Sequence, residues 1–281
     1  DVDFVFAQLH HPYKSELWIA GETDFTGDVI GLMENFSTDC GKPSIHFFGH
    51  THGYSRGQSR DHNHLWVNVA TAGGNIDYWG EYAQNDYEEF TVSHDDWGFV
   101  IVESVAGNNP SFTLKRISRG NENEFRDNEL RDEITIKMIN ESPLTPSFNY
   151  PNNELVSPDY VMLVSSPFLD PDDDGHGQSH WKVSYDCNDF SNPVFESWKS
   201  FQNIYFNEDT QADDNLEDEE ITYLEPNTSY CWTVRYRDKS LKWSQWSAPS
   251  PFSTGESELS SNLVLNPGAE DGINHWTLVS G

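Results

Sequence analysis

Histidine is the residue type in this chain whose positions could do metal chemistry. His50 and His52 lie two positions apart in the segment GHTH, which directly follows the apolar run 44–48. His10 follows an earlier apolar run, residues 2–9. Imidazole nitrogen is a good ligand for zinc, iron and manganese. Two buried strands that end at one edge of a sheet would bring these side chains together, so the sequence predicts metal ligands at His10, His50 and His52.

The other histidines stand in less specific settings. His11 is adjacent to His10, and we expect it to support the site or to pack in the loop rather than to bind metal. His46 lies inside an apolar run and is expected to be a hydrogen-bonded core residue. His62 and His64 form a second HxH pair, for which a structural role is favoured because no further ligand pattern accompanies it.

The elements that must position these histidines form a mixed α/β pattern in the first half of the chain. Residues 28–36 carry apolar side chains on one helical face. A helix between two buried strands, followed by further strands, is typical of an α/β domain. Short apolar or alternating runs predict these strands at 2–9, 44–48, 65–71, 97–105, 111–117 and 134–138.

Polar residues and three prolines between 140 and 153 predict a domain boundary. The segment LEPNTSY at 224–230 resembles the tyrosine corner of fibronectin type III domains, which places Tyr230 at a turn. The last segment, 256–281, resembles the start of a truncated, carbohydrate-binding-like β-rich module. Turn signals separate short predicted strands that indicate an all-β sandwich, at 160–164, 181–185, 221–224, 230–236 and near Phe252.

Three stretches of the first half resemble blocks of a known enzyme family. They are LHHP at 9–12, FGHTHGYSRG at 48–57 and ATAGGN at 70–75, and they are similar to the calcineurin-like metallophosphoesterases, most closely the purple acid phosphatases. The resemblance implies two iron, zinc or manganese ions and a small phosphate-ester substrate, a monoester rather than a diester. By the same resemblance, the ligands and substrate contacts are His10 and His50 on one ion, His52 on the other, and Tyr54 and Arg56 at the substrate.

The chain also departs from that family. The blocks DxH, GDxx[DY] and GNH[DE], which supply further ligands and the bridging carboxylate, are absent from the sequence. A bridging carboxylate is needed to hold two cations together against their repulsion and to place the attacking water. We therefore expect the C-terminal part of a longer enzyme that is inactive as this chain alone.

The resemblance implies the fold class of the first half, and the segment 140–153 and the strand pattern after it predict the domain limits. Residues 1–141, with a core at 1–117, are expected to form the C-terminal half of a metallophosphoesterase α/β sandwich. Residues 142–255 are expected to form a fibronectin type III-like domain, an all-β immunoglobulin-like sandwich. The implied function is hydrolysis of phosphate esters by a secreted dinuclear-metal phosphoesterase with accessory β-sandwich domains. The alternative is an extracellular binding or adhesion protein that carries a degenerate phosphoesterase remnant.

An acidic segment in the second half has the spacing of a calcium loop. Asp170, Asp172 and Asp174 precede Gly175 in the pattern D-x-D-x-D-G, which supplies oxygen ligands at its first, third and fifth positions. The twelfth position is Trp181, where an EF-hand loop has Glu. Calcium binding is one interpretation of this segment, and a solvated acidic loop is the favoured alternative.

Charge and hydropathy restrict the partners. The chain has 47 acidic against 16 basic side chains and a net charge of −31, which argues against nucleic acid because phosphate binding needs a basic surface. There is no apolar run of about 18 residues, so no membrane span is expected. An acidic surface and accessory domains favour a secreted, extracellular or periplasmic protein, with glycan as a possible partner of those domains.

Cysteine positions are compatible with one disulfide but do not favour it. Cys187 and Cys231 lie near neighbouring predicted strands. Cys187 shares its alternation with Trp181, whereas Cys231 alternates with the inward-facing Tyr230. The two thiols would then face opposite sides of the sheet, so the sequence predicts that they are not bonded.

Overall fold

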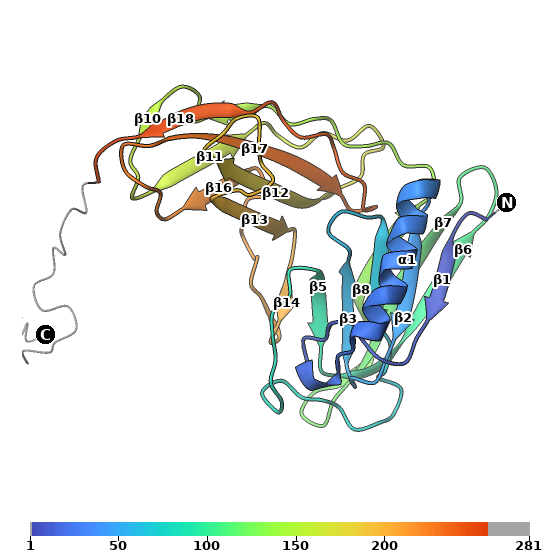
Figure 1. Cartoon of the computed structure of the whole chain (residues 1–281). Helices are drawn as coiled ribbons and strands as arrows, with labels where there is room; N and C mark the ends of the chain where they lie inside the picture. Colours follow the sequence, from blue (N-terminus) through green and yellow to red (C-terminus); the bar gives the residue numbers. More distant parts are fainter. Residues whose placement is uncertain (1, 258–281) are drawn as a thin grey trace, which may run out of the picture.

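β-Strands dominate the computed structural model, which describes residues 2–257 (Figure 1). The strands form four sheets, and α1 (Asp24–Cys40) is the one α-helix among the described residues, preceded by the single 3-10 turn η1 (Ile19–Gly21). The expected fold class, an α/β metallophosphoesterase half joined to a β-sandwich, is therefore wrong. One helix between two apolar runs predicts an α/β domain, but after this helix the chain adds only strands.

The largest sheet has seven strands in the order β1-β2-β4-β3-β5-β14-β15. Its first three strands, β1 (Val5–Gln8), β2 (Ser44–Phe48) and β4 (His64–Asn68), are parallel. β3 (Tyr54–Gln58) and β5 (Phe90–His94) continue the sheet in antiparallel fashion. The ends of β1 and β2 therefore reach the same edge of the sheet, as the sequence predicts for the residues that carry the histidines.

Both faces of this sheet are covered. α1 packs on one face of the sheet. The helix is capped by Gly41, whose φ of 61° is the left-handed conformation that glycine adopts readily at a helix C-terminus. The other face packs on a three-stranded meander of β6 (Trp97–Val105), β7 (Ser111–Gly120) and β8 (Phe125–Lys137). The core between the two sheets includes Ile45, Leu65, Val67, Val92, Phe112, Leu114 and Ile136.

The second half is a two-sheet sandwich. One sheet has the order β10-β18-β17-β12-β13 and the other the order β16-β11-β9. Trp181 and Trp232 lie at its centre, fully buried, with ring centroids 5.6 Å apart. The strands are β9 (Phe148–Tyr150), β10 (Leu155–Val156), β11 (Val161–Ser165), β12 (His176–Ser184), β13 (Phe195–Ser200), β16 (Asp218–Ile221), β17 (Ser229–Asp238) and β18 (Ser250–Thr254).

The predicted tyrosine corner is present in the sandwich. The hydroxyl of Tyr230 accepts a hydrogen bond of 2.9 Å from the backbone N–H of Glu225, and the Tyr230 side chain is buried. Tyr230 also stacks on Phe252 of β18. This bond fixes the turn that leads into β17, which is the role that the sequence segment LEPNTSY indicates.

The two halves share a sheet. A hairpin of β14 (Ile204–Tyr205) and β15 (Glu208–Asp209) leaves the sandwich, and Ile204 pairs with Val92 of β5 (Figure 1). The predicted limits 1–141 and 142–255 therefore separate two units, of which the second contributes a hairpin to the main sheet of the first. Of the predicted module at 256–281, residues 258–281 lie outside the described residues. Within residues 2–257, no helix has the length and hydrophobicity that crossing a bilayer requires.

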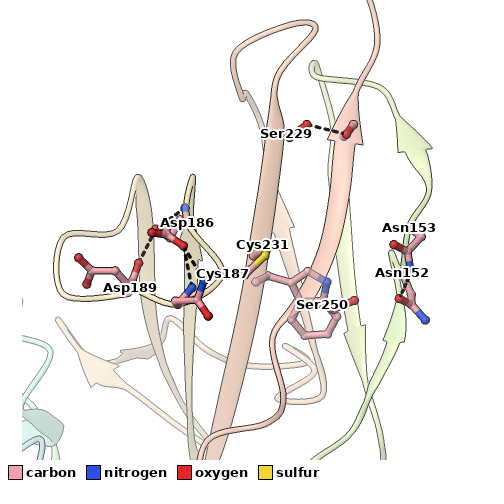
Figure 2. Close-up of a disulfide and its surroundings, with 12 residues drawn as sticks. Asn152, Asn153, Asp186, Cys187, Asp189, Ser229, Cys231 and Ser250 are labelled. Carbon is pink, nitrogen blue, oxygen red and sulfur yellow. Dashed lines mark hydrogen bonds between the residues drawn. A yellow bond between two sulfur atoms is a disulfide. The ribbon is translucent and has the colours of Figure 1, made fainter.

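Cys187 and Cys231 form a disulfide, which corrects the prediction that they are not bonded (Figure 2). Their Cα atoms are 5.1 Å apart. β12 ends at Ser184, which pairs with Cys231, and Cys187 lies three residues further along in a turn. Strand alternation does not extend to Cys187, because the turn after β12 sets the direction of its side chain.

The disulfide should contribute measurably to the stability of the sandwich. It closes a 44-residue separation, for which the chain-entropy model gives about 4 kcal/mol. Non-reducing peptide mapping should recover Cys187 linked to Cys231 with Cys40 free. Cys187→Ser/Cys231→Ser should lower the free energy of unfolding by a similar amount in denaturant titration, with Cys40→Ser as the control. A map in which Cys40 pairs with either residue would contradict the assignment.

Candidate functional site

Three histidines converge at the edge where β1 and β2 end. His10, His11 and His50 each offer a ring nitrogen, and these nitrogens all lie within 4.8 Å of one another. The His50 ring centroid is 5.2 Å from that of His10 and 4.2 Å from that of His11. The predicted convergence of His10 and His50 is therefore observed. Their binding of metal stays a prediction.

Backbone hydrogen bonds hold the two strand ends together. Leu9 N–H donates to the carbonyl of Phe47, and Gly49 N–H donates to the carbonyl of His10. His50 has a φ of 69°, a conformation that is uncommon for a residue with a side chain and that turns its ring toward His10 and His11. The site is thus built by local strain and by the parallel register of β1 and β2.

Aromatic and glycine residues shape one wall of the histidine cluster. The indole of Trp18 stacks on His50 with ring centroids 5.2 Å apart and an interplanar angle of 28°. A Cβ at Gly21 would lie 2.9 Å from the Trp18 ring and 3.3 Å from His50, so glycine is required there for the close approach. A hollow of about 560 Å³ adjoins the cluster and is lined by His10, His11, His50, Glu22 and Thr26.

The surroundings of His50 favour its neutral imidazole. Partial burial lowers the pKa of His50, and the neighbouring His11, His10 and His52 lower it further. A neutral imidazole is the form that binds a metal ion. No carboxylate joins the three histidines within the described residues, so this group fits one ion and does not fit the pair of ions that the family resemblance implies.

His11 belongs to the histidine cluster and His52 does not, which is the reverse of the prediction. The backbone N–H of His52 donates to Asp77 Oδ2 at 2.7 Å, and its ring packs against Gly74 rather than joining the cluster. His11, expected to support or pack, supplies the third nitrogen. The signal for His11 is its position in the strand-end segment HHP, where two successive side chains can both reach the same edge.

Tyr54 and Arg56 are not placed to contact a substrate at the histidines. Both side chains are buried on β3. Tyr54 Oη donates to Asp132 Oδ2 at 2.6 Å, and Arg56 Nη2 donates to Asp132 Oδ1 at 2.9 Å. Asp132 lies on β8, so the pair joins the two sheets of the first half. The arginine lowers the pKa of Asp132 despite burial, and this carboxylate therefore stays ionised.

The acidic segment lies at the junction of the two halves. Asp170 Oδ1 accepts hydrogen bonds from the backbone N–H groups of Asp172 and Asp174, which gives the segment its turn. Asp174 pairs with Lys137 of β8, and Asp172 accepts the N–H of Glu141. These contacts account for one oxygen of each aspartate within the fold. Calcium binding by the segment stays a prediction.

His46 and His64 form a buried polar pair beneath α1, and the expectation that His46 is a core residue is confirmed. His46 Nδ1 lies 2.9 Å from His64 Nε2, and His64 Nδ1 lies 2.7 Å from the hydroxyl of Ser44. Both histidines are fully buried. Burial lowers the pKa of His64 to about 3 and that of His46 well below its usual value. The pair is therefore neutral in the folded protein.

This pair predicts a loss of stability in acid. The folded pKa of His64 is depressed, so the unfolded chain binds a proton first, and the stabilising contribution is lost as the pH falls below about 6.5. Between about pH 7 and pH 5 the contribution of His64 should fall by roughly 2 kcal/mol.

The variant His64→Gln keeps a hydrogen-bonding partner for Ser44 but does not titrate. The difference in unfolding free energy between the original chain and this variant should therefore shrink on acidification, as measured by denaturant titration at both pH values. Equal differences at the two pH values would contradict this assignment. The comparison between chains is needed because buried Glu16 and Asp238, with pKa values raised to about 8 and about 6, change stability in the opposite direction.

A second hollow, of about 430 Å³, lies over the disulfide on the sandwich. Tyr185 forms part of its wall, is 55% exposed, and stacks on Tyr230 with ring centroids 5.3 Å apart. Figure 2 shows Asn152 and Asn153 on a segment next to the strands that carry Cys231 and Ser250. The polar lining consists of Asn153, Glu154, Ser229 and Ser253. The sequence does not reveal this hollow, because the alternation along the predicted strand 181–185 does not show that β12 ends at Ser184, before Tyr185.

A family model matches part of the sandwich. The model of the Rha78A-like N-terminal immunoglobulin domain matches residues 209–258, which include β16, β17 and β18. No curated protein gives a match to this chain.

Among solved structures, an α-L-rhamnosidase of Streptomyces avermitilis complexed with L-rhamnose is 26% identical and has a TM-score of 0.28. The match covers 41% of this chain and 10% of the rhamnosidase, so the chain spans a small part of that protein. Fibronectin(III)-like modules of Clostridium thermocellum CbhA are 10% identical, with 78% of this chain and 94% of that chain covered and a TM-score of 0.31. Titin domains A168–A170 are 12% identical, with 55% and 49% covered and a TM-score of 0.27.

The predicted metallophosphoesterase family is wrong for this chain. The family match points to an immunoglobulin-like domain at residues 209–258, the four sheets make the described residues mainly β, and neither finding supports the predicted hydrolase and phosphatase assignments. The blocks HHP and GHTH are short. Two parallel strands that end side by side bring such residues together in many folds, and a fold-independent cluster of this kind does not specify a reaction.

Proposed function

We propose that the chain is an extracellular accessory binding region whose immunoglobulin-like sandwich binds neutral glycan in the hollow beside Tyr185. The observation that carries the proposal is the exposed Tyr185 ring in a polar hollow on a domain of immunoglobulin type. It is a binding function, and it needs no catalytic group.

The lining of this hollow suits a sugar ring. An aromatic face packs against the apolar C–H face of a pyranose, while side-chain oxygens and amides satisfy its hydroxyls. Tyr185 is held in place by stacking on the buried Tyr230, so little freedom is lost on binding. Glu154 and Asn153 supply hydrogen-bond partners from the opposite segment. The net charge of −31 favours a neutral glycan over an acidic one at this surface.

Glycan binding can be measured on a glycan array and then by titration with the best ligand. Tyr185→Ala should weaken binding about tenfold or more, because the stacking face is lost. Tyr223→Ala is the matched control, since Tyr223 is also exposed on the sandwich but does not line the hollow. Equal affinities of the two variants, or no glycan bound by the original chain, would contradict the proposal.

A second function is favoured by the histidine cluster. We propose that His10, His11 and His50 bind one divalent transition-metal ion, because their nitrogens lie within 4.8 Å of one another and offer a compact set of imidazole ligands. The arrangement leaves room for water or a further ligand from the hollow beside it.

Metal binding should be tested on the untagged chain with cobalt(II), whose visible absorption reports its coordination, followed by zinc competition. His11→Ala should weaken binding by about 100-fold or more, whereas His52→Ala should leave it within a few-fold. His62→Ala is a control outside the cluster. Loss of binding in His52→Ala but not in His11→Ala would overturn the ligand set proposed from the structure.

Export from the cytoplasm follows as part of the proposal. The Cys187–Cys231 disulfide supports an oxidising compartment, where such bonds persist. Fractionation of the native source with thiols trapped in acid should recover the chain outside the cytoplasm with both cysteines oxidised. A cytoplasmic chain with reduced cysteines would contradict export.

A further inference from the structure

We propose that the cleft between the two halves binds a small organic carboxylate, with Lys239 and Arg131 as its cationic contacts. The cleft has a volume of about 380 Å³, which is within the range of small-molecule sites. It is separate from the histidine cluster and from the hollow beside Tyr185, with which it shares no lining residue. The inference therefore does not depend on the proposed function.

Basic side chains outnumber acidic ones in the lining of the cleft, in contrast to the chain as a whole. Acidic side chains outnumber basic ones by 47 to 16 in the sequence, yet Arg56, Arg131, Lys137 and Lys239 line this cavity against Asp132, Glu133 and Asp174. Two of those cations are already neutralised inside the protein. Arg56 is bound by Asp132, and Lys137 by Asp174. The charged groups of the cleft that form no ion pair among the described residues are Lys239, Arg131 and Glu133, so two cations face one carboxylate and the free charge of the lining is positive.

Lys239 is a cation without an anionic partner. Its Nζ lies 3.8 Å from the centroid of the Phe201 ring, and no carboxylate among the described residues forms an ion pair with it. Burial, and then the neighbouring Arg56, lower the pKa of Lys239, as expected for an ammonium group held near other positive charge. A bound carboxylate would favour the charged ammonium and so oppose both effects.

A β-bulge in β8 sets the direction of the Arg131 side chain. Arg116 pairs with Asp132 and Ile117 pairs with Leu130, so Arg131 is the extra residue of β8 at this point. Bulges of this kind redirect a side chain out of the regular alternation. Arg131 lines the cleft together with its neighbour Asp132 and forms no ion pair with a carboxylate among the described residues. Most other lysines and arginines of the chain are paired with carboxylates, which makes two unpaired cations in one cleft distinctive.

The net negative charge of the protein does not prevent anion binding in this cleft. At physiological ionic strength the Debye length is about 8 Å, so distant surface carboxylates are screened while groups that line the cleft are not. Arginine presents a planar fork to a carboxylate, and lysine adds a point charge from the opposite half. Because Lys239 follows β17 and Arg131 lies on β8, a bound carboxylate would join the two halves.

Isothermal titration of the full chain with glucuronate, glucose and sulfate tests the proposal. Glucuronate should bind at one site and glucose should not, because only the former carries a carboxylate. Lys239→Gln and Arg131→Gln should each weaken glucuronate binding about tenfold. Arg119→Gln, which removes an exposed arginine outside the cleft, should leave it unchanged. Sulfate that competes with glucuronate, together with weaker binding at high salt, would further support charge recognition.

Three outcomes would overturn the inference. They are the absence of glucuronate binding at millimolar concentrations, equal binding of glucose, and binding that neither Lys239→Gln nor Arg131→Gln alters. Thermal unfolding of each variant should match that of the original chain, and Lys239→Arg should retain binding. Failure of this test leaves glycan binding at Tyr185 unaffected, because Tyr185→Ala and Lys239→Gln change different cavities.

Discussion

The buried guanidinium of Arg237 is the interaction on which the arrangement of the two halves depends. Arg237 projects from β17 of the sandwich and is fully buried. Its Nη1 donates to the carbonyl of Ser59 at 2.9 Å, and its Nη2 donates to the carbonyl of His62 at 2.7 Å. Burial lowers its pKa to about 9, yet the group remains charged at neutral pH. Because these carbonyls belong to the turn between β3 and β4, the guanidinium ties the sandwich to the sheet that presents the histidines.

Aromatic and cationic side chains surround the hydrogen bonds of Arg237. Arg235 lies 4.3 Å from the ring centroid of Trp243 and pairs with Asp61 of the first half. Trp243 Nε1 donates to the carbonyl of Arg60 at 2.7 Å, and Arg60 in turn lies over Trp198. Arg60 packs on one tryptophan ring of the sandwich and Arg235 on three, and partial desolvation there strengthens the attraction of each cation to the aromatic faces. The hairpin β14–β15 adds strand pairing to the same junction, so the cleft near Lys239 has walls fixed from both sides.

The sequence predicts the strands whose positions are set by local patterns of apolar and turn residues. β2 coincides with the predicted run 44–48, and β17 contains the predicted strand 230–236, because both combine apolar alternation or burial with clear turn signals. The meeting of His10 and His50 was predictable from strand ends alone. The pairing of Ile204 with Val92 was not, because a single long-range bridge leaves no periodicity. Cys187 was misjudged because a turn, rather than the strand, sets its direction, and His11 because adjacent residues leave a strand end in directions that alternation does not describe.

The distribution of charge links these features to the ligands that suit each surface. Few cations are present in the chain, and three of its arginines form buried internal bonds: Arg56 joins β3 to β8, Arg116 binds Asp96, and Arg237 joins the halves. The surface is left strongly acidic, which attracts cations and repels anions before any specific contact forms. A cluster of imidazole ligands at an exposed edge is suited to a metal ion under that field, and the hollow beside Tyr185, which Glu154 lines without any cation, is suited to a neutral sugar. An anion needs cations that lack an internal partner, and the proposed cleft brings two of them, Lys239 and Arg131, into one cavity.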